Sequence, residues 1–321
     1  MKKIGILFLM LLLCGYTRAE AAAPPTEMSP EASLLETIDP GREAAVMTQP
    51  PPPPVPVVLT PEAPGLSEVR CDKAVIDHSN TADGYIMVNY LAETEKRLKV
   101  LLQGPSTRYS YNLTPGQWTA LPLSDGNGSY QAGIYTQVSG NKYAKVMTAD
   151  FSVALTDEFA PFLRPNQYVN YSEATNAVNL GLEITAGIEN PLEKVAAIYD
   201  YVITNLTYDY HRAQTVKSGY LPDLDQVLAD KKGICFDYAA LMTAMLRSQE
   251  IPCKLVVGYA GSTYHAWISV WTAESGWIDG IIFFDGQLWH RMDPTFASTG
   301  AGNEEILEFI QSGTYTVKYL Y

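Results

Sequence analysis

The sequence predicts two folded regions, an antiparallel β-sandwich followed by an α+β domain. The 321 residues, 47% of them hydrophobic and 18% charged, are enough for two domains of ordinary size. Short apolar stretches separated by turn residues fill residues 66–157. From residue 158 onward, the apolar residues first recur at helical spacing and then alternate as they do in strands.

Charge and cysteine content limit the function. Lys and Arg total 22 against 35 for Asp and Glu, which gives a net charge of −13. This composition supplies no broad basic surface for a phosphate backbone, so nucleic acid is not an expected partner. The four cysteines are too few for a disulfide scaffold, and no Cys/His cluster has zinc spacing. Since the chain has no calcium loop or cofactor motif either, we expect neither a metal nor a cofactor.

The first 21 residues are typical of a signal peptide. Two lysines precede the apolar run Ile4–Leu13, which is too short to cross a bilayer but fits a signal core. A small-x-small pattern ends at Ala21, so we expect cleavage there and a secreted or cell-surface protein. The alternative is lipid attachment at Cys14, although a bulky residue precedes it. We expect membrane contact only through the signal or this anchor.

Residues 22–65 predict a disordered linker. They are rich in Pro, Ala, Glu and Thr and include the run Pro50–Pro54. Such a segment buries too little apolar surface to offset its ordering entropy, and consecutive prolines favour extended polyproline II. A ligand for a proline-recognition domain is the less favoured interpretation.

Residues 66–157 predict the β-sandwich. Stretches such as "YIMVNYLA" and "KVMTADFSVAL" are separated by turn pairs such as Asp83-Gly84. Tyr85 and Met87 are expected to alternate with outward-facing residues along their strand. This region contains no catalytic constellation, and His78 lies in a polar loop. Binding of a polymer and support of the neighbouring domain are both open as its role.

The helical region begins after residue 158. Ser172 is a candidate cap for a first helix, and Asn190 for a second that opens with Pro191. Asp225 is expected to cap a short third helix. The second helix carries a predicted buried stripe at helical spacing, made of Val195, Ile198, Tyr199 and Val202.

A helix is predicted from about Cys235 to Gln249, with its stop at Pro252. Cys235 lies in the first turn, where unpaired N–H groups and the helix dipole favour a thiolate. Gly233, which lacks a side chain, is expected to let a substrate approach the sulfur. A packed thiol and a nucleophile are both compatible with this stretch alone.

Two later segments add a base and a carboxylate. The strand "YHAWISVWT" sends His265 and Trp267 to one face, and Asp293 follows in "RMDPTFA". A Cys, a His and an Asp in this chain order supply a nucleophile, a general base and an orienting carboxylate.

The blocks "GICFDYAALMTAMLRSQEIPCKLVVGY", "YHAWISVW" and "RMDPTFA" resemble the three signature blocks of the transglutaminase-like superfamily. The resemblance covers about 192–298. It implies a papain-like Cys-His-Asp fold, with Cys235 as nucleophile, His265 as general base and acid, and Asp293 orienting it. Bacterial members of this type often carry a β-sandwich before the catalytic domain. We therefore expect an immunoglobulin-like sandwich over 66–157 and a catalytic domain over 158–321.

The predicted function is acyl transfer or hydrolysis at an amide through a Cys235 thioester. The expected substrate is a protein or peptide, cell-wall peptide included, and Tyr264 and Trp267 are candidate substrate-binding residues beside Gly233. The acceptor, amine or water, is open. The alternative is a catalytically silent adhesion protein that binds through the sandwich.

Overall fold

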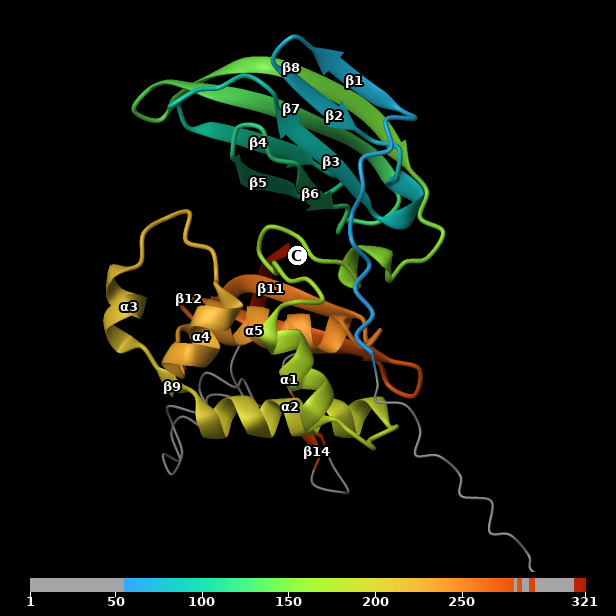
Figure 1. Cartoon of the computed structure of the whole chain (residues 1–321), viewed down its shortest axis with the longest axis vertical. Helices are drawn as coiled ribbons and strands as arrows, with labels where there is room; N and C mark the ends of the chain where they lie inside the picture. Colours follow the sequence, from blue (N-terminus) through green and yellow to red (C-terminus); the bar gives the residue numbers. More distant parts are fainter. Residues whose placement is uncertain (1–54, 280–281, 285–288, 292–314) are drawn as a thin grey trace, which may run out of the picture. The chain divides into compact units, whose positions relative to one another are not determined.

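Two antiparallel sheets of four strands each form the first part of the chain (Figure 1). The computed structural model describes residues 55–279, 282–284, 289–291 and 315–321. One sheet has the order β1-β2-β3-β6 and the other β5-β4-β7-β8. The strands are β1 (Glu68–Cys71), β2 (Ala74–Asp77), β3 (Tyr85–Tyr90), β4 (Leu98–Gln103), β5 (Arg108–Leu113), β6 (Thr119–Pro122), β7 (Gly128–Ser139) and β8 (Lys142–Val153).

Strand β3 departs from the predicted alternation, because all six of its residues are buried. Tyr85 shows the reason. Its hydroxyl accepts a hydrogen bond from the Glu62 N–H at 3.1 Å, and the Arg164 guanidinium lies 5.1 Å from its ring centroid. The chain before β1 and the chain after η2 (Ala160–Phe162) therefore cover the second face of β3. Strand β5, in contrast, does alternate between buried and less buried residues.

The end of the predicted linker is held by hydrogen bonds. The Val57 N–H donates to the Ser248 carbonyl at 2.9 Å, and the Asn80 side chain donates to the Glu62 carbonyl at 2.8 Å. Residues 55–65 thus contact both regions of the chain. The predicted signal peptide, its cleavage point at Ala21, the lipidation candidate Cys14 and the rest of the linker lie outside the described residues.

The structure confirms the predicted start of the second helix. The Asn190 side chain accepts from the Leu192 and Glu193 N–H groups, and Pro191 is the first helical residue. The predicted stripe is buried. The helices of this region are α1 (Asn176–Ile184), α2 (Pro191–Asn205), α3 (Tyr210–Thr215) and α4 (Leu224–Asp230).

Two other predicted caps are wrong by a few residues. Helix α1 begins after Thr175, because the Ser172 N–H is bound to the Thr175 hydroxyl in a turn that precedes the helix. Helix α4 begins after Asp223, whose carboxylate accepts from the Gln226 N–H at 3.0 Å. Asp225 instead accepts from the N–H at the start of α1 at 2.8 Å, so its carboxylate joins the two helices.

A third antiparallel sheet, of order β13-β12-β11-β16, lies against helix α5 (Cys235–Arg247). Its edge strand β16 comes from the C-terminal end of the chain and pairs with β11. A Cβ at Gly258 would meet the Thr316 carbonyl oxygen and the Trp267 ring, so β16 can approach β11 only at a glycine. The remaining strands are β9 (Thr207–Tyr208), β10 (Lys232–Gly233), β11 (Cys253–Ala260), β12 (Thr263–Thr272), β13 (Gly276–Asp279), β14 (Ile282–Phe284), β15 (Trp289–Arg291) and β16 (Tyr315–Leu320).

Arg247, the last residue of α5, is fully buried and joins three segments. Its guanidinium donates to the main-chain oxygens of Cys253 at 2.9 Å, Arg164 at 2.7 Å and Tyr321 at 2.7 Å. Burial lowers the pKa of Arg247, but its ordinary value is so high that the group stays charged. These bonds give Arg247 a structural role.

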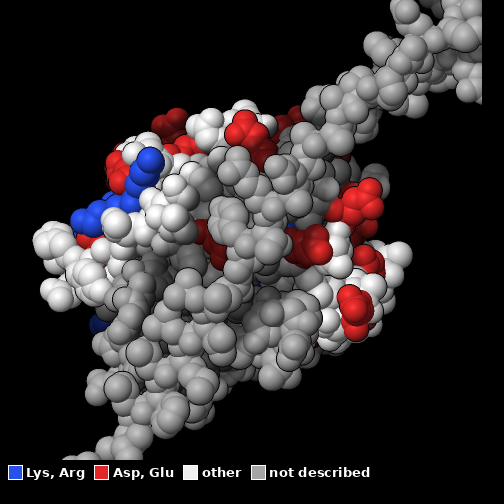
Figure 2. Space-filling model, turned by 90° about the horizontal axis from the view of Figure 1, so that it is seen from below, with Lys and Arg blue, Asp and Glu red and all other residues white. Residues whose placement is uncertain are grey.

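The surface reflects the acidic composition. In Figure 2, acidic side chains lie at several separate places on the face shown, whereas basic side chains gather mainly at one edge. Within the described ranges, no helix combines the length and the apolar character that crossing a bilayer requires.

Candidate active site

Cys235 is the first residue of α5 and is half-buried. Ile234 caps the helix in an extended conformation, so the chain turns sharply at the thiol. The first helical turn carries N–H groups without intrahelical partners and the positive end of the dipole, which together favour a thiolate. The other described cysteines, Cys71 and Cys253, are also free thiols.

Asp237 fixes this first turn from inside the protein. One carboxylate oxygen accepts from the Ile234 N–H at 2.8 Å, and the other accepts from the Tyr220 hydroxyl at 2.6 Å. The side chain is fully buried, and the Arg212 guanidinium lies 3.6 Å from it. These contacts hold the main chain on both sides of Cys235.

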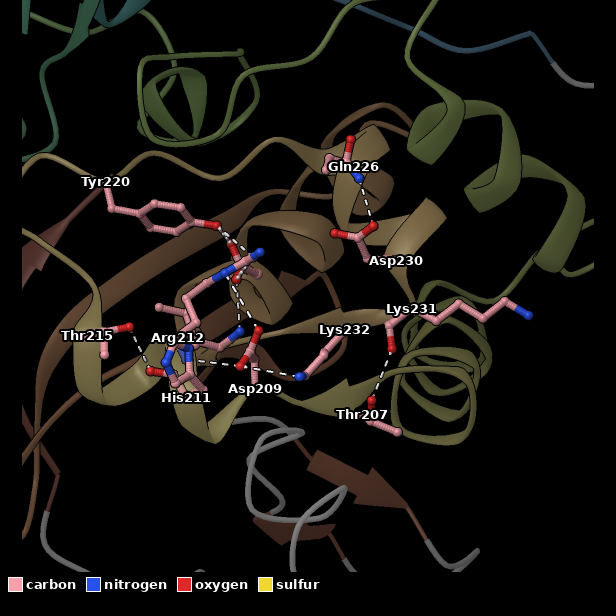
Figure 3. Close-up of polar contacts among 12 residues, drawn as sticks. Thr207, Asp209, His211, Arg212, Thr215, Tyr220, Gln226, Asp230, Lys231 and Lys232 are labelled. Carbon is pink, nitrogen blue, oxygen red and sulfur yellow. Dashed lines mark hydrogen bonds and ion pairs between the residues drawn. The ribbon is translucent and has the colours of Figure 1, made fainter.

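Arg212 extends this network to a second carboxylate (Figure 3). Its guanidinium lies 3.7 Å from the Asp209 carboxylate, and its main-chain N–H donates a hydrogen bond to that carboxylate at 2.9 Å. Lys232 approaches Asp209 from β10 at 3.4 Å. The N–H of Arg212, and then the charges of Lys232 and Arg212, lower the pKa of Asp209. The network thus ties α3, β10 and α5 together.

Gly233 lies directly behind Asp237. It is buried in β10, and a Cβ there would lie 2.7 Å from the Asp237 Cβ. Glycine is therefore required at position 233 for a structural reason, because a side chain there would clash with Asp237, whose carboxylate fixes the turn. The predicted contact between Gly233 and substrate stays a prediction.

His265 lies on β12, opposite Gly258 of β11, and is only 4% exposed. Its ring centroid lies 6.3 Å from that of Trp267 at an interplanar angle of 22°. Trp267 is itself buried and meets the Tyr315 ring edge-on. It therefore packs in the core beside the imidazole, and its predicted contact with substrate stays a prediction.

Tyr264 lies at the surface next to His265 and is 54% exposed. Its ring meets that of Tyr259, itself 39% exposed, at 5.4 Å. Partial burial raises the pKa of Tyr264, and the negative charges of Tyr319, Tyr259 and Cys235 add to this shift. Cys235 is thus one of the groups whose negative charge acts on Tyr264.

The site therefore combines the start of α5 with the adjacent strand β12, which contact each other. They bear Cys235 on one side and Tyr264 and His265 on the other. The predicted third member, Asp293, lies outside the described residues. No group of three potential metal-ligating side chains occurs among the residues that the structure describes.

The raised pKa of Asp237 gives a prediction on stability. Burial raises it, and the hydrogen bonds from Tyr220 and Ile234 oppose the shift only in part. Between the ordinary aspartate pKa of about 3.9 and this raised value, the folded protein holds a proton that the unfolded chain has lost. The free energy of unfolding should therefore fall as the pH rises through that window and then level off.

Asp237→Asn should lack this fall, as urea unfolding at a series of pH values would show. Glu95→Gln, which changes an exposed carboxylate, is the matched control and should keep it. Parallel pH profiles for the wild-type protein and Asp237→Asn would contradict the prediction.

Part of the chain is similar to known proteins. Residues 178–280 match the model of the transglutaminase-like superfamily. A protein-glutamine gamma-glutamyltransferase from Pseudomonas aeruginosa is 29% identical over 105 residues, which are 28% of this chain and 14% of that protein. Uncharacterized protein ML0607 from Mycobacterium leprae is 34% identical over 139 residues, or 39% of this chain and 46% of that one. The red sea bream transglutaminase structure has 13% identity and a TM-score of 0.30, covering 73% of this chain and 56% of that one.

Helix α5 and strands β11, β12 and β13 lie within the residues that match this transglutaminase-like core domain. The similarity to the transglutaminase-like superfamily is that of residues 178–280, which are less than half of the chain. The chain spans less than half the length of both curated relatives.

Proposed function

We propose that the protein is an exported cysteine enzyme that cleaves an amide through a thioester on Cys235. The observation that carries the proposal is the start of α5. A half-buried thiol lies in a first turn fixed by Asp237, on a helix packed against the strand that bears His265. A buried carboxylate that holds this turn in place is expected where catalysis requires a precisely positioned thiol.

The mechanism assigns each group one task. His265 takes the thiol proton, and the Cys235 thiolate attacks the amide carbonyl carbon. The tetrahedral intermediate collapses when its C–N bond breaks, and the leaving amine or ammonia takes the proton from His265. A second amine or water then attacks the thioester, loses its proton to the imidazole and releases Cys235. Asp293 orients the imidazole in this proposal.

The acceptor decides what the enzyme does to its substrate. An amine acceptor makes it a cross-linking transferase, and water makes it a peptidase or deamidase. Both outcomes use the same residues. The two four-stranded sheets over 66–157 are proposed to be an immunoglobulin-like sandwich, and the lysines and apolar run at the N-terminus support export.

The rate of iodoacetamide alkylation of Cys235 against pH tests the nucleophile. We expect alkylation to persist well below the free-cysteine pKa of about 8.5, and His265→Ala to slow it at least about tenfold near neutral pH. Peptide mass separates Cys235 from Cys71. Burial raises the pKa of Cys253 to about 11, so this buried thiol adds little background.

His211→Ala, which removes an exposed imidazole from α3, is the matched control and should leave the profile unchanged. If Cys235 titrates as an ordinary exposed thiol with or without His265, the proposed pair does not exist.

A further inference from the structure

A lysine lies beside the exposed tyrosines of the candidate site. The Lys318 Nζ is 5.9 Å from the ring centroid of Tyr264 and 5.3 Å from that of Tyr319. Cations within about 6 Å of a ring centroid are attracted by the negative face of the ring. Lys318 is itself exposed, so its ammonium group can meet a ligand from solution.

An irregularity in β16 explains this placement. Val257 of β11 pairs with Tyr319, but the next residue, Gly258, pairs with Val317. Lys318 is the extra residue in this bulge. A bulge interrupts the strict alternation of a strand and redirects the side chain it adds. Lys318 consequently lies over Tyr264.

The charge of Lys318 is not paired with a carboxylate of the described residues, unlike the charges of Arg212 and Lys232 near the start of α5. Arg212 and Lys232 are paired with Asp209 and Asp237. Lys318 forms no ion pair with any carboxylate in the described ranges. Because the chain as a whole carries a charge of −13, an exposed cation here reduces the repulsion that an anionic group meets beside Tyr264.

We propose that Lys318 selects acyl donors that carry a carboxylate near the reacting amide, with Tyr264 and Tyr259 contacting the adjoining part of the donor. The substrate class is an acidic peptide. This inference rests on the proposed function, because it takes Cys235 as the attacking group. The exposed pair of rings offers apolar contact, and the ammonium group adds the charge that fixes the orientation of the peptide.

Two alkylating probes of similar size test the inference. Iodoacetate carries the carboxylate and iodoacetamide does not, so the ratio of their rates at Cys235 reports the local potential. We expect Lys318→Gln to lower the iodoacetate-to-iodoacetamide ratio about twofold at low salt, and Lys318→Glu to lower it about fourfold. High salt should weaken both effects. Lys73→Gln, an exposed lysine in the turn after β1, is the control that should leave the ratio unchanged.

The outcomes separate the two proposals. Normal iodoacetamide alkylation with a ratio that ignores Lys318 would overturn the inference and leave the nucleophile intact. A ratio that falls in Lys73→Gln as much as in Lys318→Gln would also overturn it, because the effect would then reflect net charge. Failure of both probes at Cys235 in the wild-type protein would overturn the proposed function and this inference with it.

Discussion

Cys235→Ala is expected to abolish amide hydrolysis and amine incorporation, with turnover reduced by about 10⁴-fold or more. The methyl group cannot form a thioester, so the reaction loses its covalent intermediate. Folding should be unaffected, because the thiol is half-buried at the helix start and alanine is the best helix former. Ammonia release from glutamine peptides, peptide cleavage and incorporation of a labelled amine are the three measurements.

Cys71→Ala is the matched control, since Cys71 is a half-buried free thiol on β1. It should retain full activity in each assay. Hydroxylamine added to the wild-type protein should trap the acyl group as a hydroxamate, which reports the thioester whatever the natural acceptor is. Activity that survives in Cys235→Ala would falsify the proposed mechanism.

Arg247→Met should lower the free energy of unfolding by about 3–5 kcal/mol, because three main-chain oxygens lose a charged donor and two of these bonds are buried. Methionine fills much of the same volume, so the loss reports the hydrogen bonds more than a cavity. Urea unfolding followed by tryptophan fluorescence measures the change.

Arg247→Lys separates charge from geometry. It keeps the cation but cannot reach three oxygens in a planar fork, so it should recover only part of the loss. Arg108→Gln, an exposed arginine on β5, should change the unfolding free energy by less than about 0.5 kcal/mol. A loss in Arg247→Met as small as this would contradict the structural role of the buried guanidinium.

Local signals in the sequence predicted much of the fold. The start of α2 was predictable because Asn190 caps the helix by accepting from N–H groups two and three residues later, and Pro191 suits the first helical position. The start of α5 was predictable because an apolar helical pattern begins at Cys235. The burial of both faces of β3 was not predictable. It depends on Arg164, which follows β3 by many residues and covers the Tyr85 ring.

Some residues of the candidate site were likewise predictable from the sequence, and others were not. Motif and spacing predicted Cys235 and His265 as site residues, and their catalytic roles stay predictions. An Asp at the third helical position, as Asp237 is, is a known signal for a bond back to the cap N–H. Tyr220 and Arg212 gave no such signal, because their contacts to Asp237 are long-range.

The position of the Lys318 side chain was also not predictable from the sequence. A simple alternating strand predicts which face each residue takes, but the bulge opposite β11 changes the face within β16. Only the observed register reveals that its side chain approaches Tyr264.

The hydrogen bond from Arg247 to Tyr321, the residue that follows β16, also bears on the order of folding. Helix α5 and the hairpin of β11 and β12 are close in sequence, so they can assemble early. Strand β16 comes much later in the chain, and its pairing with β11 must close a long loop. Until Tyr321 arrives, the guanidinium of Arg247 lacks one of its three acceptors. Helix α5 should therefore reach its full stability only after β16 has paired with β11.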